Sequence, residues 1–260
     1  MAEALTLYYK PWTMFWIIES LGLMFFVLGL IYKFSFYFKG EGRSLYNQLN
    51  YRMMVKSFIQ EVVLQKQIAK RSLLRWYIHM SIFYGFMGLL LLSAIAVVLE
   101  TVIPETSQIG QYMLNGQGHN YYKAGGDLFG LILFLGLCLA FLRRFVFRSK
   151  QLNTDISDTT TLVFLLLLVI TGFLLEALRI SLLSLQPELQ YSFIAIQLAK
   201  LFRGKDWVPS FASLLWTTHA FLTAALLAYF PHSKFLHIIN SPVQIVLNAS
   251  EERMRGDLYI

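Results

Sequence analysis

Apolar residues in this chain are gathered into long runs that are separated by polar stretches. Each run is about 20 residues or longer, which is the length that an α-helix needs to cross a bilayer. The runs cover residues 12–36, 75–99, 125–147, 159–183 and 209–231. The first run lacks the basic start and small-residue cleavage site of a signal peptide, so we expect it to be retained. The pattern predicts an all-α integral membrane protein with five transmembrane helices.

Composition agrees with a protein that is embedded in a bilayer. Hydrophobic residues make up 57% of the chain and charged residues 14%, whereas soluble proteins average roughly 45–50% and 25%. The single cysteine, Cys138, lies inside an apolar run. It excludes an intrachain disulfide, and alone it cannot hold an iron–sulfur cluster or a thiolate zinc site.

The basic residues predict the orientation of the chain. Residues 37–75 contain eight Lys and Arg against two Glu, and the basic stretch "RRFVFRSK" follows the third run. The loop after the second run is acidic, with Lys123 as its only basic residue, although Lys200, Arg203 and Lys205 after the fourth run oppose the trend. The positive-inside rule favours an N-terminus outside and a cytoplasmic C-terminus. The net charge of +7 therefore reflects topology, and no nucleic-acid partner is expected.

The cytoplasmic residues 43–72 are predicted to form one amphipathic helix. Its apolar residues recur at three- and four-residue steps between lysines and arginines, at Leu45, Leu49, Met53, Ile59, Val62 and Val63. Such a helix lies on anionic lipid or docks a cytoplasmic protein, and the two roles are compatible. We expect residues 1–240 to form the membrane domain, including this helix. Residues 241–260 are expected to form a cytoplasmic tail, a second docking element.

Two histidines of the last run have the spacing of ligands to stacked haems. His219 and His237 are eighteen residues apart, about five helical turns, so a continuous helix would carry both on one face at a separation of about 27 Å. Pro231 is expected to bend this helix or to end its membrane part. His79, at the start of the second run, matches His237 in depth, so His79 and His237 are the expected ligand pair of an inner haem.

Other roles for these histidines stay open at this point. Ionisable groups inside a membrane are candidates for function, and a proton relay in a transporter would use the same residues. A zinc site is less favoured, because the sequence has no HxxxH or carboxylate–histidine cluster. His232, which follows Pro231 at the water boundary, is expected to lie among lipid headgroups.

The arrangement resembles the gamma-subunit family of respiratory nitrate reductase, which includes the cytochrome b subunits of membrane-bound heterodisulfide reductase and of sulfite-reduction-linked complexes. The stretch "FPHSKFLHIINSP" is similar to the closing stretch of that family. "RWYIHMSIFYGFMGLLL" and "ITGFLLEALRI" look more like the heterodisulfide-reductase branch. The resemblance implies one haem b or two, chemistry with menaquinone or another quinone near the outer haem, and location in the cytoplasmic (inner) membrane of a prokaryote. It also implies electron exchange with a cytoplasmic iron–sulfur protein that is heterodisulfide reductase D-like or similar.

One departure from the family pattern concerns the outer haem. The family has a second histidine ten residues after the first in span two, and this sequence has Leu89 there. His219 therefore lacks its usual partner. His119 could replace it if its loop folded back by about 10 Å, the haem could be five-coordinate or absent, or a methionine such as Met87 could complete the site.

Polar residues at the outer ends of the runs are candidates for the quinone site. Arg179 or Lys123 would bind haem propionates or a quinone carbonyl, while a carboxylate would exchange quinol protons with the outside. Lys123 is close to the location of the family's quinone-site lysine, and the carboxylate candidates are Asp127 and Glu176. The expected function is electron transfer between membrane quinone and a cytoplasmic redox partner, within a quinone-linked oxidoreductase complex. A haem-free anchor for a cytoplasmic enzyme and a proton-coupled transporter are the alternatives.

Overall fold

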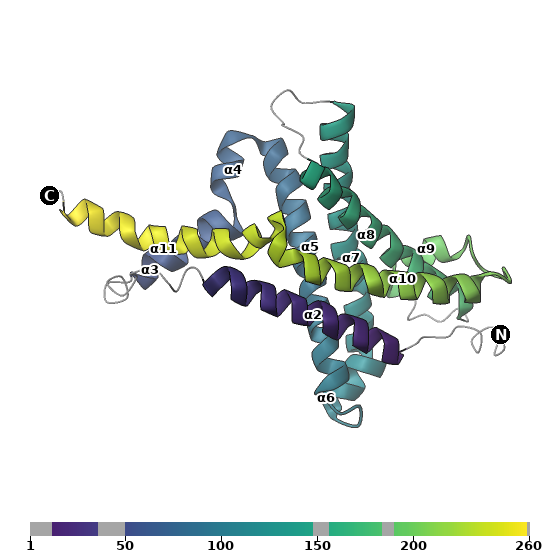
Figure 1. Cartoon of the computed structure of the whole chain (residues 1–260). Coiled ribbons are helices and arrows are strands. Elements are labelled where there is room, and N and C mark those ends of the chain that lie inside the picture. The colour runs from purple at the N-terminus through teal and green to yellow at the C-terminus, as the bar shows by residue number, and fades with distance from the viewer. Residues whose placement is uncertain (1–11, 36–49, 148–155, 184–189, 259–260) are drawn as a thin grey trace. The chain divides into compact units, whose positions relative to one another are not determined.

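The computed structural model describes residues 12–35, 50–147, 156–183 and 190–258, and every regular element in these ranges is helical. Five of its helices are long and apolar enough to cross a membrane, so the predicted all-α membrane fold is confirmed (Figure 1). These spans are Trp12–Ser35, Leu73–Thr101, Gln117–Val146, Ile156–Leu182 and Val208–His232. The sides of the membrane on which the termini lie stay a prediction.

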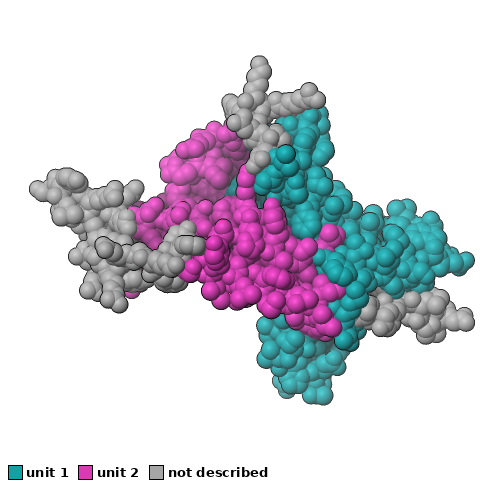
Figure 2. Space-filling view, in the orientation of Figure 1, with its two compact units in different colours: residues 1–15, 77–221 teal, residues 16–76, 222–260 magenta. Residues whose placement is uncertain are grey.

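The long helices have these bounds: α2 (Trp12–Ser35), α5 (Leu73–Thr101), α7 (Gln117–Phe141), α8 (Ile156–Leu182), α10 (Val208–Tyr229) and α11 (His237–Leu258). The shorter elements are α3 (Tyr51–Ser57), η4 (Phe58–Val63), α4 (Lys66–Arg71), α6 (Gln108–Gly110), η5 (Gln111–Asn115), η6 (Leu142–Val146), α9 (Ala195–Ala199), η8 (Phe230–His232) and η9 (Lys234–Leu236). The chain divides into two compact units, described separately below. Unit 1 contains residues 1–15 and 77–221, and unit 2 contains residues 16–76 and 222–260 (Figure 2).

In unit 1, small residues bring α5 and α7 into close contact. A Cβ atom added at Gly85 would lie 2.5 Å from the backbone nitrogen of Leu133, and one added at Gly136 would lie 2.8 Å from the Cβ atom of Ser81. Any larger residue at these two positions would push the helices apart. Because residue numbers rise along α5 as they fall along α7 at these contacts, the two helices are antiparallel.

Buried apolar clusters attach α8 to its neighbours in unit 1. A Cβ atom at Gly130 of α7 would lie 2.9 Å from the ring of Phe173 of α8, which fixes the register of these two helices. One cluster joins α8 to α10 and consists of Leu178, Leu182, Val208, Ala212 and Leu215. A second joins α8 to α9 and consists of Ala177, Ile180, Ala195 and Ala199. Figure 1 shows α9 beside the C-terminal end of α8, where the sequence predicts only a loop.

In unit 2, the parts of α2 and α10 that belong to this unit pack through glycines. A Cβ atom at Gly22 would lie 2.8 Å from the carbonyl oxygen of Ala224. Within the same helix pair, the hydroxyl of Thr223 donates a hydrogen bond to the half-buried carboxylate of Glu19. Glu19 lies inside a span, where lipid tails supply no hydrogen-bond donor. The bond from Thr223 therefore gives this carboxylate a polar partner.

The expected single amphipathic helix is interrupted, and its residues 43–49 lie outside the described residues. Over the rest, α3 continues as the π-helical turn η4, and the chain then turns at Gln65 before α4 begins. Gln65 has a φ of 49°, the left-handed region that ends a helix. The indole N–H of Trp76 donates to the carbonyl oxygen of Leu64 at 2.9 Å, which satisfies a group that the break exposes. Residues 241–258 of the predicted tail are helical as part of α11, which packs against α3 and η4.

Candidate functional site

His219 lies in the middle of α10 and faces α8 within unit 1. Its Nδ1 atom is 2.9 Å from the hydroxyl oxygen of Thr171. Because one ring nitrogen is engaged in this way, Nε2 is the nitrogen of His219 that can bind a metal. A metal-bound histidine in proteins almost always has a hydrogen-bond partner at its other nitrogen, so His219 has the environment that an axial haem ligand requires.

Gly172 keeps space open beside this imidazole. A Cβ atom added at Gly172 would lie 3.5 Å from Cε1 and 4.0 Å from Nε2 of His219. The added carbon alone would make ordinary contact, but any longer side chain would grow over the Nε2 edge of the ring. The absence of a side chain at this position therefore fits a planar ligand that approaches Nε2.

His237 does not lie on the same helix as His219. The helix α10 ends at Tyr229, the 3₁₀ turns η8 and η9 follow, and His237 is the first residue of α11. Pro231 ends the membrane helix, as expected, and Ser233 is extended with a φ of −109° and a ψ of 176°. The continuous helix that would have turned both histidines to one face is therefore absent, and their spacing alone does not fix how they face.

In unit 2, the turn before α11 orients the ring of His237. Its Nδ1 atom is hydrogen-bonded to the backbone carbonyl oxygen of Lys234, the first residue of η9. A carbonyl oxygen can only accept a hydrogen bond, so Nδ1 carries the proton and Nε2 carries the lone pair. The exposed imidazole of His237 is thus in the tautomer that binds haem iron.

His79 lies in the second turn of α5 and is half-buried. It belongs to unit 1, whereas His237 belongs to unit 2. The proposed pairing of these two histidines continues to rest on their depth along the spans. The donor chemistry of His219 and His237 fits haem b as the group to be held.

His119 is helical, and the structure does not bring it to His219. The third span begins at Gln117, earlier than expected, so His119 lies in the first turn of α7. The contact between Gly130 and Phe173 marks the level of Gly172, and therefore of His219, on α7. His119 precedes Gly130 by 11 residues, or about 16 Å along the helix axis. One iron atom cannot bind both imidazoles across this separation.

Two of the other residues considered for the outer site lie near the level of His219. On α5 that level falls at Gly88, because a Cβ atom there would meet the ring of Phe129, the residue before Gly130. Leu89 and Met87 flank Gly88 in the sequence. Met87 is therefore at a suitable depth, and an open coordination position is the other alternative.

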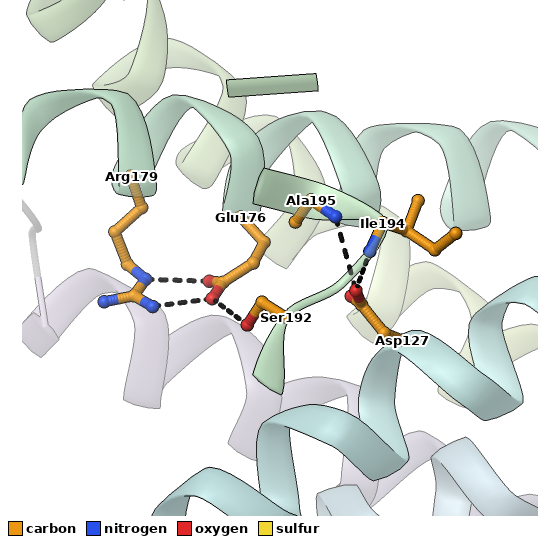
Figure 3. A network of polar contacts seen from close by, with 6 residues as sticks. All are labelled: Asp127, Glu176, Arg179, Ser192, Ile194 and Ala195. Atoms are coloured by element: carbon orange, nitrogen blue, oxygen red, sulfur yellow. Dashed lines mark hydrogen bonds and ion pairs between the residues drawn. The ribbon is translucent and has the colours of Figure 1, made fainter. Parts of the chain in front are cut away.

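The predicted polar residues near the N-terminal end of α7 and the C-terminal end of α8 form one cluster in unit 1, called the outer polar cluster after its predicted side of the membrane. The guanidinium of Arg179 donates two hydrogen bonds to Glu176, from Nε to Oε2 at 2.7 Å and from Nη2 to Oε1 at 2.6 Å. The hydroxyl of Ser192, which is buried, donates to the same carboxylate at 3.2 Å (Figure 3). The ion pair is thus held in one geometry by the chain that follows α8.

Asp127 has a different set of partners. Its Oδ2 atom accepts the backbone N–H groups of Ile194 at 2.5 Å and of Ala195 at 3.3 Å, and its side chain is buried (Figure 3). These two N–H groups belong to the first turn of α9 and its preceding residue, where a helix supplies no acceptor of its own. Asp127 therefore attaches α9 to α7.

Lys123 lies one turn before Asp127 and is half-buried. Lys123 and His119 are each close enough to Glu176 and Arg179 to interact with them electrostatically. Within the described ranges, the ammonium group of Lys123 has no hydrogen-bond or ion-pair partner. A positive charge without a fixed partner inside a span is suited to bind a polar oxygen or nitrogen of a ligand.

Three residues of this region were not found from the sequence: Thr171, Gly172 and Ser192. A signal existed for the first two, since a Thr-Gly pair in the middle of an apolar run interrupts it at mid-span. Nothing in the sequence indicates Ser192, whose partner Glu176 is 16 residues away across a loop.

Comparison with known proteins identifies the family. A sequence model of HdrE, the E subunit of dihydromethanophenazine:CoB--CoM heterodisulfide reductase, matches residues 55–245. The same subunit from Methanosarcina acetivorans is 26% identical over 200 residues, which cover 76% of this chain and 68% of the relative. Those from Methanosarcina mazei and Methanosarcina thermophila are 27% and 28% identical, over 76% of this chain and 69% and 68% of theirs. No solved structure matches. The family model covers more than half of this chain, so the chain belongs to the HdrE family of heterodisulfide reductase membrane subunits.

Proposed function

We propose that the protein is a membrane cytochrome b subunit that transfers electrons between a membrane-soluble carrier and a cytoplasmic iron–sulfur protein. The five spans and the family membership support the class, a membrane subunit of an electron-transport complex. The name of the relatives gives dihydromethanophenazine as their electron donor and the CoB–CoM heterodisulfide as the acceptor. A carrier of the quinone or phenazine class is therefore the proposed partner of the membrane domain.

The observation that carries this proposal is the orientation of two histidines. His219 and His237 each have Nδ1 engaged by a hydrogen-bond partner, which is the arrangement usual for a histidine that binds a metal through Nε2. His79 and His237 would hold an inner haem and His219 an outer one, and haem b, when bound, accepts and passes on single electrons. A wider kinship with the gamma subunits of respiratory nitrate reductase is part of the proposal and rests on the sequence resemblance.

The outer polar cluster is the proposed carrier site. Oxidation of a dihydro carrier removes two electrons and two protons, so the site must stabilise negative charge and accept protons. Lys123, which lacks a fixed partner among the described residues, would bind the polar atom of the carrier on which negative charge develops. His119 is the group proposed to accept a proton from the carrier, through a ring nitrogen. Glu176 and Arg179, held in one geometry by Ser192, would fix the electrostatic field around both.

The cytoplasmic partner is proposed to dock on α3 and the helices next to it. Tyr51, Val55 and Phe58 recur at four- and three-residue steps, and their exposed fractions are 72%, 59% and 44%. Arg52 and Lys56 lie beside this apolar stripe. The helix α3 also packs against α11. The stripe would be covered by the iron–sulfur protein in the complex, and contact with anionic lipid beside it is compatible with this role.

The experiment that tests the proposal is a reduced-minus-oxidised spectrum of the purified chain, with haem quantitation. We expect a b-type spectrum, loss of one spectral component in His79→Ala and in His237→Ala, and loss of a different component in His219→Ala. Full haem content in the double variant of His79 and His237 would contradict the inner site. A colourless preparation after gentle purification would support a haem-free anchor instead.

A further inference from the structure

The hydroxyl group of Thr171 has three polar neighbours. Its oxygen lies 2.8 Å from the backbone carbonyl oxygen of Leu167, 3.0 Å from that of Leu168 and 2.9 Å from Nδ1 of His219. The hydroxyl can donate one hydrogen bond only, while its oxygen can accept two. The direction of the bond to His219 therefore follows from where the single hydroxyl hydrogen lies.

The two carbonyl oxygens decide this direction. Neither carbonyl can donate, so an oxygen–oxygen separation of 2.8 Å between Thr171 and Leu167 requires the hydroxyl hydrogen between them. If the hydroxyl donated to His219 instead, its lone pairs would face two carbonyl oxygens at 2.8 Å and 3.0 Å without a hydrogen in either contact. The hydroxyl therefore donates to the α8 backbone and accepts from His219.

We propose that Thr171 is a positioning residue that fixes His219 as the Nδ1–H tautomer, aims its Nε2 past Gly172 and lowers the midpoint potential of the haem held there. The inference rests on the proposed function, because it presupposes a haem at His219. Hydrogen bonding from Nδ1–H to an acceptor raises the basicity of Nε2. A more basic ligand stabilises ferric iron over ferrous iron, which lowers the potential.

The two histidines differ in the acceptor that they use. His237 donates to a backbone carbonyl oxygen within its own turn, whereas His219 donates to a side chain on another helix, 48 residues away. A single substitution on α8 can therefore change the environment of His219 without changing α10, the helix that carries it. No substitution elsewhere can remove the acceptor of His237 in the same way, because that acceptor is main chain.

The test is a potentiometric titration of the purified full-length chain with its haem. The variant Thr171→Val removes the acceptor and keeps the shape of the side chain, while Thr171→Ser keeps the hydroxyl. Thr218→Val is the matched control, because the Thr218 hydroxyl also donates to the carbonyl oxygen four residues before it, at 2.9 Å, but has no imidazole partner among the described residues. His219→Ala identifies the spectral component that belongs to this site.

We expect the component that His219→Ala removes to shift to a more positive potential in Thr171→Val and to keep its wild-type potential in Thr171→Ser and Thr218→Val. If His219→Ala removes this component but Thr171→Val leaves its potential unchanged, the inference is wrong and the proposed function stands. If His219→Ala removes no component, the outer haem is wrong and the inference falls with it. Should Thr171→Val fail to fold, Thr171→Ala gives the same reading through the same titration.

Discussion

Asp127 on α7 accepts the backbone N–H of Ile194 at 2.5 Å, although 67 residues of sequence separate them. With the second bond, from Ala195, the carboxylate satisfies two backbone donors at the start of α9. The loop that follows α8 also supplies Ser192 to the ion pair of Glu176 and Arg179. Asp127 therefore helps to keep the outer polar cluster in place by attaching the loop that completes it.

Replacement of Asp127 by alanine should reduce the stability of the protein more than it reduces affinity for the carrier. The substitution leaves two backbone N–H groups without their acceptor, and each buried unsatisfied group costs about 1–3 kcal/mol. We expect a lower midpoint in thermal or denaturant unfolding, and a smaller loss in Asp127→Asn, which keeps one carbonyl acceptor. An unchanged unfolding midpoint together with a raised KM for the carrier would instead place Asp127 among the ligand-binding groups.

The sequence predicts the spans of this protein well because membrane crossing depends on local composition. All five runs are helices. The family branch was also predicted, from stretches around His79 and Glu176, and family membership confirms it. Both inferences use information that is contiguous in the chain.

The features that were missed depend on contacts between distant residues or on backbone conformation. The bond between Thr171 and His219 spans 48 residues and has no signature that periodicity could reveal. The break at Gln65 could not be predicted, because apolar residues keep recurring at helical spacing on both sides of it although the backbone turns there. The directions in which the side chains of His219 and His237 point could not be predicted from their separation of eighteen residues. Two 3₁₀ turns interrupt the α-helix between them.

Replacement of Lys123 by methionine should weaken binding of the reduced carrier. The change removes a charged hydrogen-bond donor and keeps most of the length of the side chain, and hydrogen bonds to charged groups contribute about 1.5–3 kcal/mol. We expect the KM for the reduced carrier to rise about tenfold to a hundredfold, with an unchanged haem spectrum. Lys200→Met is the control, because Lys200 is exposed and its ammonium donates to Gln197 at 2.7 Å. An equal rise in both variants would indicate a general effect of surface charge.

Replacement of Gly172 by valine should prevent a haem from binding at His219. The two methyl groups would extend beyond a Cβ position that is already 4.0 Å from Nε2, so they would cover the edge of the ring. We expect the haem-to-protein ratio to fall and the component assigned to His219 to disappear. Gly126→Val is the matched control, because nothing among the described residues lies within 4 Å of the corresponding Cβ position on α7. Full haem content in Gly172→Val would show that Nε2 is approached from another side.

Replacement of Val55 by aspartate should weaken association with the cytoplasmic iron–sulfur protein. Val55 lies at the centre of the exposed stripe on α3, and a charged group there must be desolvated when a protein partner covers it. We expect less of that protein to copurify with the variant, while haem content stays at the wild-type level. Val102→Asp is the control, since this valine, just after the C-terminal end of α5, is 71% exposed. If both variants keep the partner, but a fluorescent probe at position 55 is quenched by lipid-attached quenchers, the stripe contacts the membrane surface and the partner binds elsewhere.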